Sequence, residues 1–186
     1  PYACCRHLHA ACDALKLLAA KGNLQPENIR SICDRTYSVA KSTIDCPYPQ
    51  TPYAGKFSAQ YCISALLYKG SLMDSVFSIQ NLTDPAICAL MEKISVEVDP
   101  ELEAAYQADH KRWAHRLDIT LKDDTVLTQT ITSPSGDPQN PFSQKNCDGK
   151  FLAVTAGVLQ PEQAEDICAQ IRKFEELEDV FSFLRN

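Results

Sequence analysis

One predicted hairpin decides the fold of this chain, and its first strand and turn read Leu117-Asp118-Ile119-Thr120-Leu121-Lys122-Asp123-Asp124. Apolar and polar residues alternate over 117–121, which is typical of a strand with one buried face. The two aspartates predict the turn, and residues 125–132 predict the returning strand. We therefore expect a sheet that is at least partly antiparallel.

Segments on either side of the hairpin predict further strands and helices. Residues 29–39 are rich in Ile, Thr, Tyr and Val and predict one or two strands. Apolar and polar residues alternate over 94–98, which predicts another strand. Helices are predicted at 2–21, 53–69, 85–93 and 101–106, and the chain after residue 142 predicts helices only. This order is typical of an α+β fold, with a small antiparallel or mixed sheet and helices on one of its faces.

We expect two parts, an α+β domain over residues 1–142 and a helical segment over 143–186. The apolar positions of the second part include Val154, Ile167, Phe174, Leu177 and Phe181. These are more than the small sheet can cover. We therefore expect the helical segment to pack on another domain or on a second subunit.

Composition excludes several classes of function. The chain has 186 residues and a formal net charge of −6, with acidic and basic residues interspersed. No run rich in Lys and Arg is present, so nothing favours binding to nucleic acid. No apolar stretch reaches the roughly 18 residues of a membrane span, so we expect no membrane partner.

The nine cysteines predict free thiols in a reducing, cytoplasmic setting, because their number is odd and their spacing is not that of a disulfide framework. Cys4 and Cys5 lie near His7 and His9. However, neither a C-x-x-C pair nor a distant second pair of ligands accompanies them, so we expect no metal.

The first predicted helix carries the residues that favour chemistry. Arg6, His9 and Asp13 are three and four residues apart and share one polar stripe. The helix dipole favours a neutral, basic imidazole at His9, and Asp13 is placed to fix its tautomer. Arg6 is suited to a two-pronged contact with a carboxylate. The spacing alone nevertheless favours a simpler alternative, a solvated face with an ordinary i,i+4 pair.

Four segments of the chain occur in an order that is specific to one family. They read Cys5-Arg6-His7-Leu8-His9 with Asp13-Ala14, Lys56-Phe57-Ser58 with Tyr61, the strand that ends at Asp123, and Gly136-Asp137-Pro138-Gln139-Asn140-Pro141-Phe142-Ser143 with Lys150-Phe151. In these segments the chain resembles the C-terminal part of the MmgE/PrpD family. It departs from the family at Asp124, where Gly is common, and at Ala10, where Pro or Ser is usual.

The resemblance implies a cofactor-independent enzyme for small di- and tricarboxylates. In this family the active site lies between a large N-terminal helical domain and a smaller α+β lid, and the C-terminal helices return to the helical domain. We therefore expect such a domain before residue 1, an inactive fragment in its absence, and a homodimer. The resemblance matches His9 to a functional histidine, which reverses the preference for the simpler alternative. It implies catalytic roles for His9 and Asp13 and contacts to substrate by Arg6, Lys56 and Ser58.

Several alternatives stay open. The expected reaction is dehydration of the 2-methylcitrate type; the alternatives are epimerisation of an amino-dicarboxylate such as iminodisuccinate and decarboxylation of the cis-aconitate type. A non-catalytic ligand-binding or assembly module is the alternative from another class.

Some single residues are also left open by the sequence. Lys56 suits an ion pair near a helix start as well as a substrate contact, and either Tyr48 or Tyr53 could donate a proton. We expect Tyr61 in the core, His110 and His115 on the surface, and Lys150 and Phe151 at packing positions.

Overall fold

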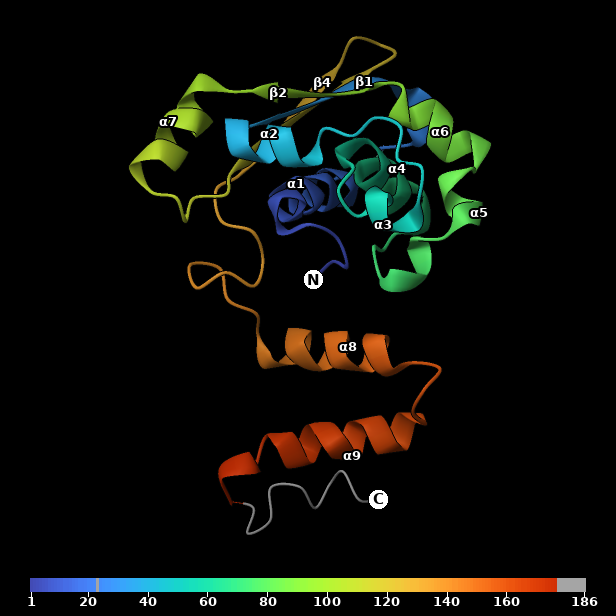
Figure 1. Ribbon diagram of the computed structural model, residues 1–186, viewed down its shortest axis with the longest axis vertical. Coiled ribbons are helices and arrows are strands. Elements are labelled where there is room, and N and C mark those ends of the chain that lie inside the picture. The colour runs from blue at the N-terminus through green and yellow to red at the C-terminus, as the bar shows by residue number, and fades with distance from the viewer. Residues whose placement is uncertain (23, 177–186) are drawn as a thin grey trace. The chain divides into compact units, whose positions relative to one another are not determined.

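The computed structural model describes residues 1–22 and 24–176 (Figure 1). The chain divides into two compact units, Pro1–Pro141 and a second that begins at Phe142. Leu177 and Phe181, which we expected in the last helix, lie outside the described residues.

A four-stranded mixed sheet is the centre of the first unit. Its strands are β1 (Ile29–Thr36), β2 (Ile94–Val98), β3 (His115–Leu121) and β4 (Val126–Ile131). They lie in the order β2-β1-β3-β4. β1 pairs parallel with β2 and antiparallel with β3, and β3 pairs antiparallel with β4. This sheet and its helices confirm the predicted α+β class.

Helices cover one face of the sheet. In the first unit they are α1 (His9–Ala20), α2 (Ser38–Ile44), α3 (Pro52–Gly55), α4 (Ala59–Lys69), α5 (Ile79–Leu82), α6 (Pro85–Met91) and α7 (Pro100–Ala108). Short 3-10 turns span Arg6–Leu8, Pro26–Asn28 and Asp74–Val76. α1, α2 and α4 lie on the same side of the strands (Figure 1). The core between these layers includes Leu15, Ile32, Tyr61, Leu117 and Ile119, each no more than 1% exposed. Tyr61 is therefore a core residue, as predicted.

The predicted helix 53–69 is two helices in the structure. The Ser58 hydroxyl caps α4 by accepting a hydrogen bond from the Tyr61 amide, and Thr51 caps α3 in the same way. The chain thus starts a new helix at Ala59 because a capping residue stands before it. Gly70 ends α4 with φ 72°, the left-handed conformation that glycine adopts without strain, as predicted.

The helix α2 was not expected, because residues 29–39 predicted only strands. β1 ends at Thr36, and Ser38 then begins the helix. Glu103 of α7 accepts hydrogen bonds from the Ser38 amide at 2.6 Å and from its hydroxyl at 3.1 Å. A carboxylate at this position stabilises the free amides of a helix start.

His115 is buried, so its predicted surface position is wrong. Its Nδ1 lies 2.7 Å from Asp34 Oδ1, and both side chains are fully buried. The Thr36 hydroxyl lies 3.0 Å from His115 Nε2 and donates to the Ala114 carbonyl. The second carboxylate oxygen of Asp34 is buried without a hydrogen-bond partner. His110 is exposed, as expected.

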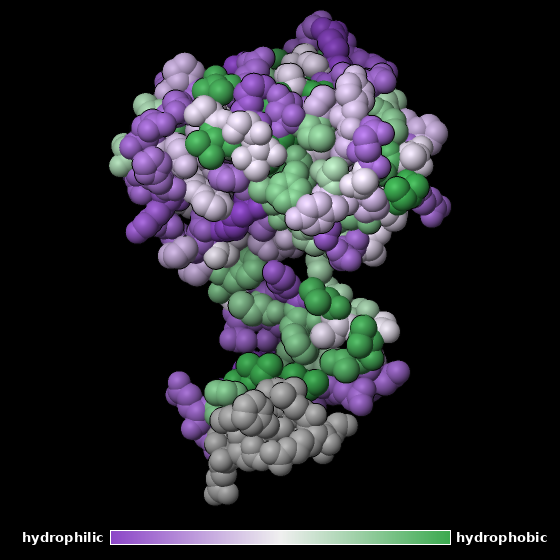
Figure 2. Space-filling model, viewed as in Figure 1, coloured by the Kyte–Doolittle hydropathy of each residue, from purple (hydrophilic) through white to green (hydrophobic). Residues whose placement is uncertain are grey.

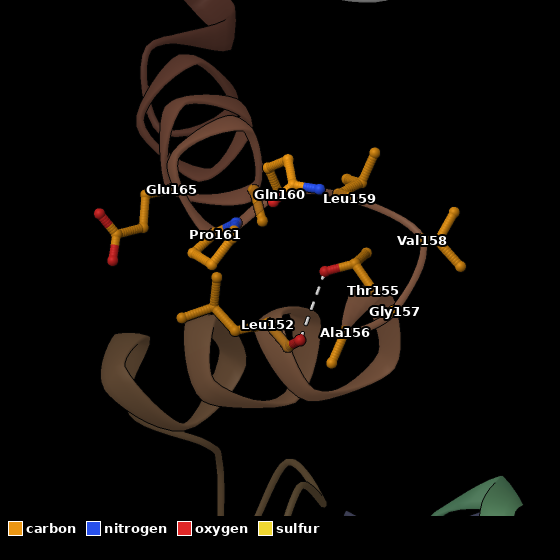
Figure 3. Close-up of a pocket in the computed structure, with 10 residues that line it drawn as sticks. Leu152, Thr155, Ala156, Gly157, Val158, Leu159, Gln160, Pro161 and Glu165 are labelled. Atoms are coloured by element: carbon orange, nitrogen blue, oxygen red, sulfur yellow. Dashed lines mark hydrogen bonds between the residues drawn. The ribbon is translucent and has the colours of Figure 1, made fainter.

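The second unit contains α8 (Gln144–Thr155), α9 (Pro161–Ile171) and a 3-10 turn at Phe174–Glu176. Between the two helices lies a hollow of about 460 Å³, lined by Leu152, Thr155, Ala156, Gly157, Val158, Leu159, Gln160, Pro161, Ala164 and Glu165 (Figure 3). Val154, Val158 and Ile171 are 59%, 84% and 47% exposed, and Figure 2 shows apolar residues on the surface of this unit. Lys150 is exposed, so its expected packing position is wrong, whereas Phe151 is half-buried.

No helix within the described ranges is both long enough and apolar enough to cross a bilayer.

The hairpin turn supports a test of backbone strain at Asp124, which has φ 68°. The loop of Lys122, Asp123 and Asp124 is a three-residue connection whose last residue is left-handed. We expect Asp124→Gly to raise the free energy of unfolding by about 0.5–1 kcal/mol, because glycine adopts this conformation without strain. Denaturant unfolding measures the change. Asp124→Ala is the matched control. Both variants lose the ion pair with Arg30, but alanine keeps the strain and should be less stable than the wild type. Equal stability of the two variants would contradict this account.

The buried pair between Asp34 and His115 supports a second prediction. Asp34→Ala should lower the free energy of unfolding by about 3 kcal/mol or more, because it leaves His115 buried without its partner. The control is Asp118→Ala, which removes a partly exposed carboxylate from the same sheet and should cost about 1 kcal/mol or less. Urea unfolding of both variants checks the difference, and similar losses would show that burial does not govern the effect.

Candidate functional site

The polar stripe lies where the N-terminal segment turns into α1. The Ala3 amide donates to the Leu72 carbonyl and the Cys5 amide donates to the Lys56 carbonyl, both at 2.8 Å. These bonds hold the segment away from a helical path, so the predicted helix 2–21 begins only with the turn Arg6–Leu8. The segment is thereby fixed beside the link between α3 and α4.

His9 is buried next to the Arg6 guanidinium. Its ring is 6% exposed and lies edge-on to the Tyr2 ring, with 5.2 Å between centroids. His9 Nε2 is 3.3 Å from the Cys4 carbonyl, and Nδ1 is 3.2 Å from Arg6 Nη1. A carbonyl only accepts and a guanidinium only donates. The contacts therefore assign the proton to Nε2, and the lone pair of Nδ1 accepts from Arg6.

Asp13 ties three parts of the unit together. Its Oδ1 accepts from the Tyr2 hydroxyl at 2.7 Å, and its Oδ2 accepts from the Ser135 amide at 2.7 Å. Burial raises the pKa of Tyr2, so its hydroxyl stays a donor. We expected Asp13 to fix the tautomer of His9, but among the described contacts the Cys4 carbonyl does so.

Arg6 has a partner in the loop that follows β4. Its guanidinium pairs with the Asp137 carboxylate and lies 5.8 Å from the centre of the Trp113 ring. The side chain of Arg6 is still 32% exposed. A hollow of about 220 Å³ adjoins it, lined by Arg6, His110, Lys111, Trp113, Asp137, Pro138 and Gln139. A small anion could thus reach the guanidinium from solvent.

The side chains of Lys56 and Ser58 have other partners than the residues of the stripe. Lys56 Nζ pairs with Asp74 at 2.5 Å and lies over the Phe77 ring. Of the two alternatives for Lys56, an ion pair or a substrate contact, the structure contains the ion pair. Ser58 is buried, and its hydroxyl donates to the Cys46 carbonyl at 2.6 Å while capping α4. The expected contact of Ser58 with substrate does not suit this position, because both of its hydrogen bonds go to backbone.

A second polar group near the stripe was missed by sequence reasoning. His7 Nδ1 lies 2.6 Å from the Tyr37 hydroxyl, and the His7 ring stacks on Trp113 with 4.6 Å between centroids. Burial raises the pKa of Tyr37 and lowers that of His7. Nothing in the sequence around Tyr37 identifies it as a candidate site residue, because its partner His7 lies 30 residues away in the chain. Tyr48 and Tyr53, the expected candidates, are each 72% exposed.

Comparison with known proteins places nearly the whole chain in one family. A family model described as the MmgE/PrpD C-terminal domain matches residues 2–176. One relative is the cis-aconitate decarboxylase of Mus musculus, which is 27% identical over 73% of the chain and 27% of the relative's length. Another is the cis-aconitate decarboxylase of Homo sapiens, which is 25% identical over 91% of the chain and 34% of the relative's length. The mitochondrial 2-methylcitrate dehydratase of Yarrowia lipolytica is 32% identical over 72% of the chain and 27% of the relative's length. The chain thus spans about a quarter to a third of the length of these relatives.

The lowered pKa of His7 predicts how acid affects stability. Between pH 7 and pH 5 the unfolded chain binds a proton at His7 that the folded state resists, so the free energy of unfolding falls. We expect His7→Gln to lose less stability over this interval than the wild type. Urea unfolding at both pH values measures the two losses, and an equal or larger loss in the variant would contradict the prediction.

Proposed function

The chain belongs to the MmgE/PrpD family, and from this membership we propose that it forms the C-terminal lid of a lyase that acts on small di- or tricarboxylates. The observation that carries the proposal is the contact between the buried His9 imidazole and the Arg6 guanidinium. It joins a base and a carboxylate-binding cation in one place. Relatives that are named as a decarboxylase and a dehydratase support a lyase.

The proposed chemistry follows from the tautomer of His9. A substrate carboxylate that binds the exposed edge of Arg6 would lie next to His9 Nδ1, the unprotonated nitrogen of the ring. When a C–H bond beside that carboxylate breaks, negative charge develops there, and the guanidinium stabilises it. His9 Nδ1 takes the proton once Arg6 Nη1 has given up its hydrogen bond to this atom in favour of the substrate carboxylate, while the Cys4 carbonyl keeps the ring oriented through Nε2. Asp13 has a positioning role in this scheme, because it holds Tyr2 against the ring.

Dehydration of a 2-methylcitrate-like acid is the reaction we propose first, because the dehydratase is the relative with 32% identity. Cis-aconitate decarboxylation is the second candidate, which the two mammalian relatives favour. Epimerisation of an amino-dicarboxylate would use the same base to return the proton on the other face. Incubation with each acid, followed by product analysis, separates the three reactions.

We also propose a partner for the lid. An N-terminal helical domain would complete the active site and cover the apolar side chains that α8 and α9 expose, and Lys56 would contact substrate at the edge of the shared cleft. We propose a homodimer in the cytoplasm, where a reducing setting suits nine free cysteines.

His9 supports the decisive test of the enzyme. In the complete polypeptide that the gene encodes, His9→Gln should reduce turnover at least about 100-fold, because an acid/base group contributes this much. The matched control is His7→Gln, the same change two residues away, which should stay within about threefold of the wild type. Steady-state kinetics on the best substrate checks both. If His9→Gln retains more than about a tenth of the activity, His9 is not the base, and a non-catalytic module becomes the better account.

A further inference from the structure

The hollow beside Arg6 is formed by three parts of the first unit that are distant in the sequence. Arg6 belongs to the turn before α1, His110, Lys111 and Trp113 belong to the segment between α7 and β3, and Asp137 belongs to the loop after β4. The volume of the hollow is about 220 Å³. A water molecule needs only about 10–15 Å³ of such volume, so the hollow has room for a carboxylate and the carbon atoms next to it.

The charged side chains of the hollow favour an anionic ligand. Asp137 is the only acidic side chain among the described residues that line it, and its carboxylate is already paired with Arg6. Lys111 is exposed and forms no ion pair within the described ranges, while the neighbouring Asp109 pairs with Arg112. The ammonium of Lys111 is therefore available to an anion that enters the hollow.

Hydrogen bonds hold the segment that carries Lys111 in place. Trp113 Nε1 donates to the His110 carbonyl at 2.8 Å, and the Asp109 carboxylate accepts from the Lys111 amide at 3.1 Å. The Trp113 ring also stacks on the His7 ring, with 4.6 Å between centroids. A site whose walls are fixed before binding loses less conformational entropy when a ligand enters.

The loop after β4 is held equally well. The Gly136 amide donates to the Asn140 carbonyl at 2.8 Å, and the Asn140 amide donates to the Asp137 carbonyl at 2.9 Å. The Ser135 amide joins the loop to α1 through Asp13. Asp137 is thus fixed as the partner of Arg6 and leaves Lys111 to the ligand.

Other lysines of the first unit already have carboxylate partners. Lys41 Nζ lies 2.5 Å from Asp45, and Lys56 Nζ lies 2.5 Å from Asp74. An incoming carboxylate must compete with these partners. Lys111 combines an unpaired ammonium with a place in the same hollow as Arg6.

We propose that this hollow binds the second carboxylate of the substrate and that Lys111 selects acids with more than one carboxylate. This inference rests on the proposed function, in which Arg6 binds the first carboxylate. An acid with one carboxylate uses Arg6 alone, whereas a di- or tricarboxylate also forms a charge-assisted hydrogen bond with Lys111 Nζ. The Trp113 ring provides an apolar wall for the carbon atoms between the two carboxylates.

Binding of tricarballylate tests the proposal without turnover, because this saturated tricarboxylate has no hydroxyl group to eliminate. Isothermal titration calorimetry on the complete polypeptide that the gene encodes gives the Kd. We expect Lys111→Gln to raise the Kd at least about fivefold, since it removes a charge-assisted hydrogen bond. The variant should fold, because Lys111 is exposed and the turn uses its amide rather than its side chain.

Lys122→Gln is the matched control. It makes the same change of charge at an exposed lysine of the β3–β4 turn that does not line the hollow. Its Kd should stay within about twofold of the wild-type value, because solvent and salt screen a charge at a distance. An unchanged Kd in Lys111→Gln, an equal rise in both variants, or no binding by the wild type would overturn the proposal.

Steady-state kinetics separates this proposal from the proposed function. On the best acid, Lys111→Gln should raise KM and leave kcat within about threefold, as expected for a residue that binds substrate away from the reacting bond. Turnover with an unchanged KM in Lys111→Gln would overturn the role of Lys111 and leave the proposed function standing. Weaker tricarballylate binding by Lys111→Gln, with no acid turned over by the wild type, would support the hollow as a polycarboxylate site and count against the proposed reaction alone.

Discussion

The carboxylate of Asp13 is the contact on which the arrangement of the site depends. Through Tyr2 it holds the N-terminal segment against α1, and through the Ser135 amide it holds the loop that follows β4. The same loop brings Asp137 to Arg6, and the same segment brings the Cys4 carbonyl to His9. The N-terminal segment, α1 and the loop after β4 therefore meet around one side chain. Asp13 thus links the two segments that supply the partners of Arg6 and His9.

Backbone groups, more than side chains, orient the residues of this site. The imidazole of His9 is set by a carbonyl, and the segment that provides the carbonyl is held by two amide bonds to residues 56 and 72. These hydrogen bonds use only backbone atoms of Ala3 and Leu72. The proposed chemistry instead uses the side chains of Arg6 and His9.

Local patterns predicted the elements whose stabilising contacts are close in sequence. The β3–β4 hairpin, the start of α6 at residue 85 and the end of α4 at residue 69 are examples. Two of the failures involve a distant partner: Ser38 starts α2 with the help of Glu103, 65 residues away, and His115 is buried with Asp34, 81 residues away. No window of sequence contains both members of these pairs.

The same distinction between local and distant partners holds for the candidate site. Helical spacing predicted that Arg6 and His9 would be neighbours, and their Nη1–Nδ1 contact at 3.2 Å agrees. The pairing of Asp13 with Tyr2 and Ser135, and that of His7 with Tyr37, come from tertiary packing that spacing does not encode. The catalytic and substrate-binding roles of these residues stay predictions.

The position of β1 has a consequence for how the chain is made. β1 lies in the middle of the sheet, yet both of its neighbours, β2 and β3, come more than 50 residues later. On a ribosome, which releases the chain from its N-terminus, β1 emerges long before either partner exists. Its unpaired edges stay available to other chains for that interval. The charged residues Arg30, Asp34 and Arg35 on this strand therefore matter before folding, as protection against association during synthesis.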